Sequence, residues 1–403
     1  MASGQTIDRT ECAAAAATRS APTSCGDAQL DSAAAGRGRT ISFLQTQAEG
    51  AGAQEVSRQI ARGAIVKGWR ARQIFLYRRT DAFDSEPGAV FCAPERPRSP
   101  AGVARMLLRL YAELRREAPV ALVTFQHYGN VVAAPVARLA GVKLVVANQV
   151  SAPQTISRAV RLADKIAGCL GAYDHVVVNS AATQAAYASY PAPYERRLIR
   201  IDHGFREKSS QLGKAGARRA LGLPPEAALV GFAGRLHPLK QIDLAIRTLS
   251  FGGDHQLVIA GQGPDRARLE ALAREIGVLA RVRFLGELGA QAMGDFLAAL
   301  DVFVFPSAAE TFGLAPVEAA QAGLPVVAND LAILRDVLRT QDGPCALFAD
   351  ALDTPAFAVA IRRVFDDAAL AQALGARGRR LAERFPLQAM VDAYLNLADP
   401  AAA

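Results

Sequence analysis

Two glutamates with seven residues between them stand out in the stretch from Asp301 to Ala328, which reads DVFVFPSAAETFGLAPVEAAQAGLPVVA. Glu310 falls in a predicted loop, and Glu318 falls early in the helix predicted after it. Ligands of open parallel sheets bind at the carboxyl ends of the strands, and the unpaired amides of a helix start favour anions. Two carboxylate acceptors beside such donors suit a sugar nucleotide. The alternative is a solvated loop glutamate and a helix-start glutamate stabilised by the helix dipole.

The same stretch predicts the elements that would position these carboxylates. Val302 to Phe305 is a short apolar run ended by proline, typical of a buried strand in a parallel sheet. Leu314 to Gln321 carries helix formers, with Pro316 near the first turn, where a missing N–H costs little. Val326 to Ala328 then predicts the next buried strand. The predicted donors to an anion are the backbone amides of Thr311, Phe312, Gly313 and Leu314.

Two cations stand at a second strand-to-helix turn. Ala228 to Leu236 predicts a strand that contains Arg235, and Lys240 stands at the start of the helix predicted through Leu249. A guanidinium, an ammonium and a helix dipole can converge on one anion there. For either residue taken alone, a surface cation without a function is the alternative.

The first half of the chain predicts a similar series of strand, loop and helix. Thr40 to Thr46 predicts a strand, Gln47 to Gln54 a glycine loop and Glu55 to Gly68 a helix, and such glycines let amides approach an anion. The loop lacks the G-x-G-x-x-G fingerprint, so a plain tight turn is an adequate alternative. Val120 to Phe125 predicts a buried strand that places His127 at its carboxyl end. A neutral imidazole there could bond a sugar hydroxyl, move a proton or bond its own loop.

Length and composition describe a large globular protein. At 403 residues the chain exceeds the size at which one core stops growing, so two domains are expected. No apolar run approaches the length of a transmembrane helix. The five cysteines are odd in number, widely spaced and without a CxxC pair, which favours reduced thiols in the cytoplasm. The net charge of +8 favours anionic partners, but no interleaved aromatic and basic residues indicate nucleic acid.

Two other segments have a predicted role. Gly102 to Arg116 predicts an amphipathic helix with Arg105 and Arg109 on the same face as Arg116, which could contact acidic lipid at the inner membrane surface. The alternative is a helix with one face in the core and solvated arginines on the other. Residues 1–39, rich in alanine, serine, threonine and glycine, predict a disordered tail.

The stretch around the two glutamates resembles the signature of the retaining glycosyltransferases of family 4, PS-x-x-E-x-F-G-x-x-x-x-E-A-x-A-x-G-x-P-V-V-A. Twelve positions match in that order: Pro306, Ser307, Glu310, Phe312, Gly313, Glu318, Ala319, Gly323, Pro325, Val326, Val327 and Ala328. The family's G-R-x-x-x-x-K pattern is matched by Gly234, Arg235 and Lys240. The resemblance extends over nearly everything after residue 40.

This resemblance implies an α/β fold of the GT-B architecture, with two Rossmann-like domains facing a cleft. Residues 40–205 would hold the acceptor, 206–227 would be a linker, 228–385 would bind the nucleotide sugar, and a helix over 386–399 would cross back to the first domain. The implied enzyme is a retaining hexosyltransferase that uses a nucleoside diphosphate sugar. It would need neither a cofactor nor a metal, since no D-x-D motif occurs. Its acceptor would be a glycan or a lipid-linked molecule, as in polysaccharide biosynthesis.

The resemblance also implies roles for individual residues. Arg235 and Lys240 would stabilise the leaving diphosphate, Glu310 would face the donor sugar, and Glu318 would bind the ribose hydroxyls. With His127, the first three form the predicted catalytic set. The other implied donor-binding positions, besides the four amides above, are Gly50, Ala51, Gly52, Gly234, Gly261, Gly286, Glu287 and Leu288.

The chain departs from the family pattern at two places. The family often has a histidine after the strand predicted at Leu144 to Ala147, where this chain has Asn148 and Gln149. It commonly has Asn-Gly-Val at the exit from the first domain, where this chain has His203 as a predicted hinge residue. Three alternatives stay open: a sugar-nucleotide epimerase, a nucleotide-binding protein without catalysis, and a non-catalytic protein at the membrane surface.

Overall fold

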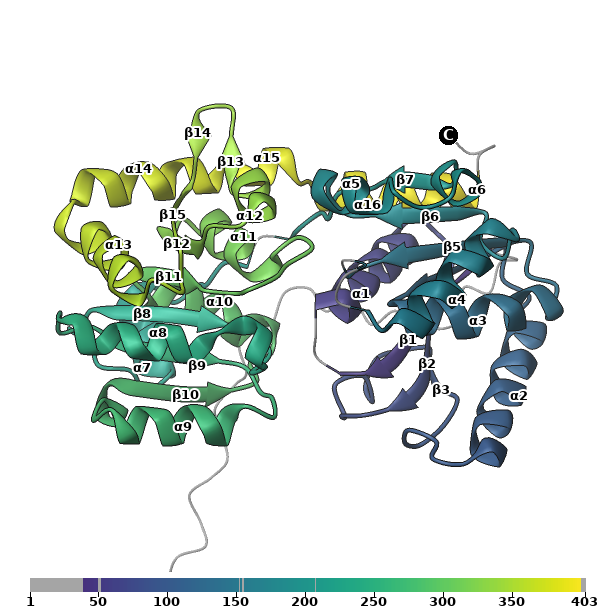
Figure 1. Ribbon diagram of the computed structural model, residues 1–403, viewed down its shortest axis with the longest axis horizontal. Coiled ribbons are helices and arrows are strands. Elements are labelled where there is room, and N and C mark those ends of the chain that lie inside the picture. Colours follow the sequence, from purple (N-terminus) through teal and green to yellow (C-terminus); the bar gives the residue numbers. More distant parts are fainter. Residues whose placement is uncertain (1–38, 50–51, 152, 154–155, 207, 400–403) are drawn as a thin grey trace, which may run out of the picture. The chain divides into compact units, whose positions relative to one another are not determined.

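The computed structural model describes residues 39–49, 52–151, 153, 156–206 and 208–399 (Figure 1). Most of the predicted tail, residues 1–38, lies outside the described residues, as do Gly50 and Ala51 of the first glycine loop. Arg39 is described, and its carbonyl accepts a hydrogen bond from the Arg70 amide.

In the described residues, seven parallel strands form the first sheet, in the order β3-β2-β1-β4-β5-β6-β7. These strands are β1 (Thr40–Ala48), β2 (Arg70–Arg78), β3 (Ala89–Phe91), β4 (Ala121–Phe125), β5 (Leu144–Gln149), β6 (His175–Val178) and β7 (Leu198–Arg200). The helices between them are α1 (Gly52–Val66), α2 (Pro100–Glu117), α3 (His127–Leu139), α4 (Arg158–Cys169), α5 (Ala181–Tyr187) and α6 (Ala192–Glu195). Neighbouring residues of β1 enter two different cores, Phe43 on one face of the sheet and Leu44 on the other. The sheet is therefore covered on both faces, as its continuous apolar strands require.

The second sheet has six parallel strands in the described residues, in the order β10-β9-β8-β11-β12-β15. These strands are β8 (Leu229–Ala233), β9 (Gln256–Ala260), β10 (Val282–Gly286), β11 (Val302–Phe305), β12 (Val326–Asn329) and β15 (Ala346–Ala349). Its helices are α7 (Gly213–Ala220), α8 (Ile242–Thr248), α9 (Arg266–Glu275), α10 (Ala290–Ala299), α11 (Leu314–Gln321), α12 (Ala332–Val337), α13 (Thr354–Asp366), α14 (Ala368–Arg379) and α15 (Leu381–Arg384). Short 3₁₀ turns occur at η2 (Pro238–Lys240), η3 (Leu249–Phe251) and η4 (Leu279–Arg281), and β13 (Arg339–Thr340) pairs with β14 (Gly343–Pro344).

The strand order reverses once in each sheet, between β1 and β4 in the first and between β8 and β11 in the second. Ligands of open α/β sheets bind at the carboxyl ends of the strands beside such a reversal. The turn that holds Arg235 and Lys240 follows β8, and the loop that holds Glu310 follows β11. The topology of the second sheet thus brings the predicted cations and the predicted carboxylate to one edge.

Two predicted segments differ from the structure. Residues 206–227 are not a plain linker, because they contain α7, in which Ala217 is buried and Arg218 is 4% exposed. The Arg218 guanidinium donates to the Ala299 carbonyl and to the Asp301 carboxylate, which fixes this helix on the second sheet. The helix predicted to start at Lys240 starts instead at Ile242, since Gln241 has a left-handed backbone with φ of 47°.

The last helix, α16 (Leu387–Ala398), packs against the first sheet rather than the second (Figure 1). Met390, Val391 and Tyr394 are buried in the same core as Phe43 of β1. A single bridge between Phe205 and Pro386 pairs the two segments that connect the sheets.

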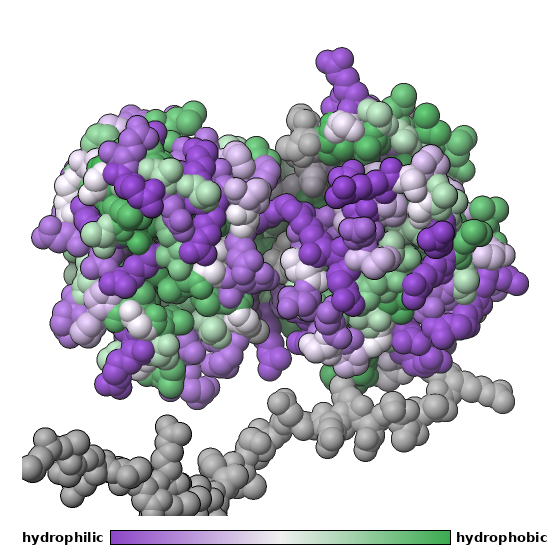
Figure 2. Space-filling view, turned by 90° about the horizontal axis from the view of Figure 1, so that it is seen from below, coloured by the Kyte–Doolittle hydropathy of each residue, from purple (hydrophilic) through white to green (hydrophobic). Residues whose placement is uncertain are grey.

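No helix among the described residues is long and apolar enough to cross a membrane. Figure 2 shows one face of the molecule, on which hydrophobic side chains lie in patches broken by hydrophilic ones.

Candidate functional site

Three of the predicted glycines meet where β8, β9 and β10 end. The Gly261 amide donates to the Gly286 carbonyl, and the Gly234 amide donates to the Ala260 carbonyl. A Cβ atom at Gly261 would lie 1.9 Å from the Gly234 carbonyl oxygen, so no other residue fits there without moving the backbone. The turns can pack this closely only because the side chains are absent.

Lys240 and Glu310 form the central contact of the site. The Lys240 ammonium pairs with Glu310 Oε1, and the Ser307 hydroxyl donates to the same oxygen at 2.9 Å. The ammonium also lies 5.2 Å from the centre of the Phe305 ring. The Glu310 side chain is 11% exposed, so its position is held by these partners at the end of β11.

Arg235 is held more weakly than Lys240. Its guanidinium lies 3.7 Å from Glu49 Oε1, and its side chain is 39% exposed. Glu49 follows β1 and also pairs with Arg79 at 3.1 Å. A long, partly exposed ion pair of this kind contributes little stability, so an incoming anion would displace Glu49 from Arg235 at small cost.

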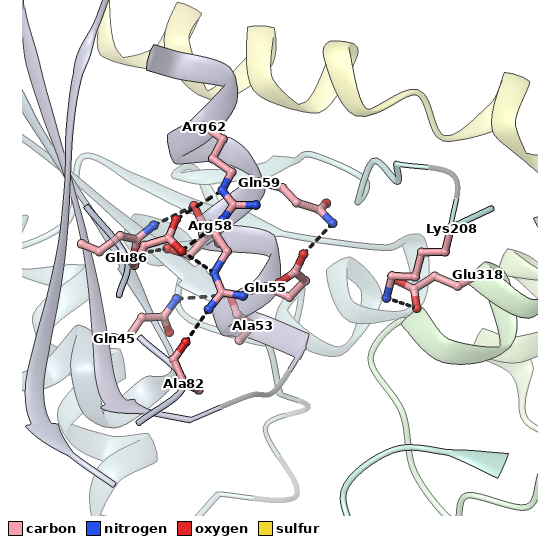
Figure 3. Close-up of polar contacts among 12 residues, drawn as sticks. Gln45, Ala53, Glu55, Arg58, Gln59, Arg62, Ala82, Glu86, Lys208 and Glu318 are labelled. Carbon is pink, nitrogen blue, oxygen red and sulfur yellow. Dashed lines mark hydrogen bonds and ion pairs between the residues drawn. The ribbon is translucent and has the colours of Figure 1, made fainter. Parts of the chain in front are cut away.

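Glu318 lies on α11 with its carboxylate nearly buried. Its Oε2 atom accepts a hydrogen bond of 2.7 Å from the ammonium of Lys208, a residue of the segment between β7 and α7 (Figure 3). Burial raises the pKa of Glu318, the charge of Lys208 and its hydrogen bond lower it, and the charge of Glu55 raises it further. Burial outweighs the lysine, so the pKa stays above its ordinary value.

The loop before α11 provides backbone rather than side chains. Phe312 is 2% exposed, with its ring packed against the rings of His203 and Phe385. The Thr311 carbonyl accepts a hydrogen bond of 2.9 Å from the Ser180 hydroxyl. Gly313 has φ of 86°, which turns the chain into α11. Beside the Glu310 carboxylate, this loop therefore offers a ligand its main chain rather than the side chains of Phe312 and Gly313.

Two more predicted donor-binding positions, Gly52 and Glu287, each lie close to residues of the other domain. A Cβ atom on Gly52, the first residue of α1, would lie 2.7 Å from Leu314 Cδ1, so a side chain at Gly52 would collide with the start of α11. Glu287, which follows β10 before Leu288, has a pKa raised by burial and then by the charges of Asp81 and Glu49.

Of the four predicted catalytic residues the structure joins Lys240 to Glu310, whereas Arg235 pairs with Glu49 and His127 lies in a separate network. Its Nε2 atom lies 2.5 Å from the Tyr187 hydroxyl, which in turn donates to the Ser151 carbonyl. The tyrosine therefore accepts from an Nε2–H, which fixes the tautomer. Burial lowers the pKa of His127 to about 3 and keeps the imidazole neutral. Among the hydrogen bonds of the described residues, none links it to Arg235, Lys240 or Glu310.

Asn148 and Gln149 were predicted to follow a strand that ends at Ala147. In the structure they are instead the last two residues of β5. Gln149 fits the strand because its amide donates to the Asp164 carboxylate at 3.0 Å and its oxygen accepts from Asn130. Asp164, fully buried on α4, also accepts from the hydroxyls of Tyr173 and Tyr194. Asn148 donates to the Tyr394 hydroxyl of α16. Both amides are thus part of a buried polar network.

Sequence reasoning missed three residues that take part in this arrangement. Glu49 carried a signal, because it is an acid directly after a predicted strand at the reversal of the sheet. Lys208 and Asp164 carried none, since a single lysine in a connecting segment and a single aspartate in a helix match no pattern. Two cavities of about 460 and 420 Å³ lie in the second half, and neither is lined by Arg235, Lys240 or Glu318.

Comparison with solved structures identifies the fold. Alr3699/HepE of Anabaena, solved in complex with UDP and glucose, matches with a TM-score of 0.77 at 19% identity, over 88% of this chain and 98% of that one. Sucrose-phosphate synthase from Thermosynechococcus elongatus matches with a TM-score of 0.75 at 21% identity, over 91% of this chain and 100% of that one. The two parallel-sheet domains therefore have the GT-B fold, which confirms the predicted fold class.

Comparison of sequences points to a particular group with that fold. Residues 214–381 match the model of the family described as glycosyl transferases group 1. The chain is 34% identical over 186 residues to the D-inositol 3-phosphate glycosyltransferase of Streptomyces avermitilis. The aligned residues make up 43% of this chain and 40% of that protein. The protein of the same name from Acidothermus cellulolyticus is 32% identical over 262 residues, 61% of this chain and 57% of that protein. The chain thus spans about half the length of these curated relatives.

Proposed function

We propose that the chain is an enzyme, a glycosyltransferase that moves a hexose from a nucleoside diphosphate sugar to a hydroxyl of an acceptor. The observation that carries this proposal is the pairing of Lys240 with Glu310 at the reversal of the second sheet, beside Arg235. All three lie within residues 214–381, the region that matches the family model. A fixed cation and a fixed carboxylate at that edge suit a diphosphate next to a sugar.

The proposed reaction retains the configuration of the sugar and needs no metal. As the bond to the diphosphate breaks, negative charge develops on the leaving oxygen, and cations fixed in advance stabilise that charge without having to reorganise. Lys240 and Arg235 take this role. Glu310 faces the donor sugar, and the acceptor attacks from the same side as the leaving group. The Lys240–Glu310 pair would keep both side chains in place while the site is empty.

The first domain is proposed to hold the acceptor, for which there are two candidates. A glycan or lipid-linked molecule fits enzymes of this architecture. A phosphorylated polyol is the second, because the relatives named above carry an inositol phosphate in their names.

A contact with the inner membrane surface is also proposed, through α2, with the cytoplasm as the working compartment. Met106, Leu110 and Leu114 are the buried residues of this helix. Arg105 and Arg109 are exposed next to Leu108, which is 67% exposed. Basic side chains around an exposed apolar residue are typical of a helix that lies on acidic lipid. Arg116 contributes less positive charge to this surface than predicted, because its guanidinium pairs with Glu113 and Glu117.

A thermal-shift panel tests the donor. UDP, GDP, ADP and their hexose conjugates are added singly, and we expect one base to raise the melting temperature, since a ligand at a hundred times its Kd stabilises the folded chain by about 2.7 kcal/mol. Arg235→Ala serves as the matched variant and should lose most of that shift. The proposal fails if no nucleotide stabilises the chain.

A product assay then separates the enzyme from its alternatives. With the donor that binds, transfer needs an acceptor, and the new glycoside keeps the anomeric configuration of the donor. Conversion of the sugar nucleotide without any acceptor would identify an epimerase instead. A chain that binds the donor but never turns it over would be a nucleotide-binding protein.

A further inference from the structure

Lys208 has no place in the proposed reaction, yet it is the ion-pair partner of Glu318. Its ammonium lies 2.7 Å from Glu318 Oε2, and the two side chains are only 20% and 12% exposed (Figure 3). Lys208 belongs to the segment that connects the two sheets, whereas Glu318 belongs to α11. Removing one partner of a pair that is largely withdrawn from water is costly, because it leaves the other charge buried and uncompensated.

Without a cation, the surroundings of Glu318 would oppose its ionised form. Burial is the largest influence and raises the pKa of this carboxyl, and the charge of Glu55 acts in the same direction. Glu55 itself is bonded to Arg58 and Gln59 of its own helix α1 (Figure 3). Lys208 is the only group among the described residues whose charge lowers the Glu318 pKa. The ionised state of Glu318 therefore depends on this one lysine.

The geometry leaves one carboxylate oxygen for a ligand. Lys208 bonds to Oε2, and among the hydrogen bonds of the described residues none ends on Oε1. A ribose offers two neighbouring hydroxyl donors, which need an ionised and correctly turned carboxylate as acceptor. A protonated Glu318 would compete as a donor instead.

We propose that Lys208 is a positioning residue for the nucleotide, which holds Glu318 turned and charged so that this glutamate can accept hydrogen bonds from the ribose hydroxyls. The inference rests on the proposed function. It assigns to the segment between the sheets a part in recognising the ribose, in addition to connecting the two sheets.

The test compares nucleotides that differ only in the ribose hydroxyls. Calorimetry at pH 7.5 gives the affinities of UDP, GDP and ADP and of their 2′,3′-dideoxy analogues for the wild type, Lys208→Met, Lys208→Arg and Lys214→Met. Lys214 is the matched control, because it also pairs with a carboxylate, that of Asp301, but has no contact with Glu318. The measured quantity is the ratio of the two affinities for the base that binds, since this ratio cancels every contact with base and phosphate.

We expect the wild type, Lys208→Arg and Lys214→Met to bind the ribonucleotide at least tenfold more tightly than its dideoxy analogue. Lys208→Met should reduce this preference to less than threefold. Without the lysine the pKa of Glu318 is raised further and the carboxyl is protonated more often, so in this variant the preference should increase as the pH is raised. In Glu318→Gln, adding Lys208→Met should change the ratio no further.

Other results decide against the inference. An unchanged ratio in Lys208→Met would show that Glu318 does not need the lysine. An equal loss for both nucleotides would place Lys208 on the phosphates instead. A wild type without preference for the ribonucleotide would remove Glu318 from the ribose site. If the wild type binds no nucleotide at all, the proposed function itself fails, a result distinct from the other three.

Discussion

The two sheets share a topology, but the side chains at their reversals differ in kind. At the second sheet, Lys240 and Arg235 are charged and are 24% and 39% exposed. At the first, the Glu49 carboxylate is charged but already pairs with Arg79 and Arg235, and the nearby Asn130 and Gln149 are neutral and fully buried. The second edge therefore offers cations that a ligand can reach, while the first offers a paired carboxylate and polar groups that hold its own strands and helices together.

Polar residues at the carboxyl end of a strand are thus not by themselves a binding site. His127 is an example, because its place after β4 is the one expected of a ligand-binding residue, yet it bonds to Tyr187. Four measurements test whether the two edges differ in function.

Replacing the cation of the second sheet should have the largest effect. Lys240→Ala should lower the rate of transfer about a hundredfold, because the loss of one preorganised group that stabilises developing charge costs roughly 3 kcal/mol. Steady-state kinetics with the donor chosen by the thermal-shift panel measure the rate, and circular dichroism checks the fold. Lys214→Ala, which removes another paired lysine of the same domain, should keep the wild-type rate. A variant at position 240 with more than a tenth of that rate would contradict the diphosphate role.

Breaking the network of the first sheet should affect stability instead. Asp164→Ala leaves the hydroxyls of Tyr173 and Tyr194 and the amide of Gln149 without their common acceptor. We expect the free energy of unfolding to fall by roughly 3 kcal/mol, since each unpaired buried donor costs about 1–3 kcal/mol. Urea titration measures this, and the affinity for the nucleotide should stay the same. If Asp164→Ala instead lowered the affinity for the nucleotide without lowering stability, the strand ends of the two sheets would not be separate in function.

Acid should weaken the chain through its buried histidines. Burial lowers the pKa of His127 to about 3 in the folded chain, below the ordinary value of 6.5. The unfolded chain therefore binds a proton first as the pH falls, so stability is complete above pH 6.5 and is lost below it. For His127 alone the loss at pH 5.5 is about 1.4 kcal/mol. Urea titrations give the free energy of unfolding at pH 7.5 and at pH 5.5, and the difference between the two values should be smaller in His127→Gln than in the wild type by this amount. An equal difference in both proteins would show that His127 is already accessible to protons.

Removal of divalent metal should have no effect. If Arg235 and Lys240 supply the positive charge at the diphosphate, then transfer in the presence of EDTA should proceed at the untreated rate. The assay is repeated with added magnesium or manganese as a control. Strict dependence on either ion would mean that the cations of the second sheet are insufficient.

The sequence predicted best where local signals agreed with the fold. The strand Val302–Phe305 and the helix Leu314–Gln321 have the predicted bounds, because a continuous apolar run, proline and glycine all mark the same ends. Helix α7 was missed because it contains two glycines and no large apolar residue, and because its stability comes from Arg218, whose partners Ala299 and Asp301 are far away in the sequence.

Within the candidate site, only the residues that belong to recognisable sequence motifs were predictable. The proximity of Lys240 and Glu310 is predictable from sequence, because their motifs place them at the ends of neighbouring strands. The structure joins them in an ion pair. The Lys208–Glu318 contact spans 110 positions and depends on how the connecting segment folds back, which no local pattern encodes. The same holds for Asp164, whose importance lies entirely in the donors gathered around it.

The packing of α16 has a consequence for how the chain is made. Because Met390, Val391 and Tyr394 complete the apolar interior that begins with Phe43, this interior stays open until the ribosome has released residues 387–398. The second sheet, whose strands are all synthesised before that point, can close first. During synthesis the half of the molecule made earlier is therefore the half finished last.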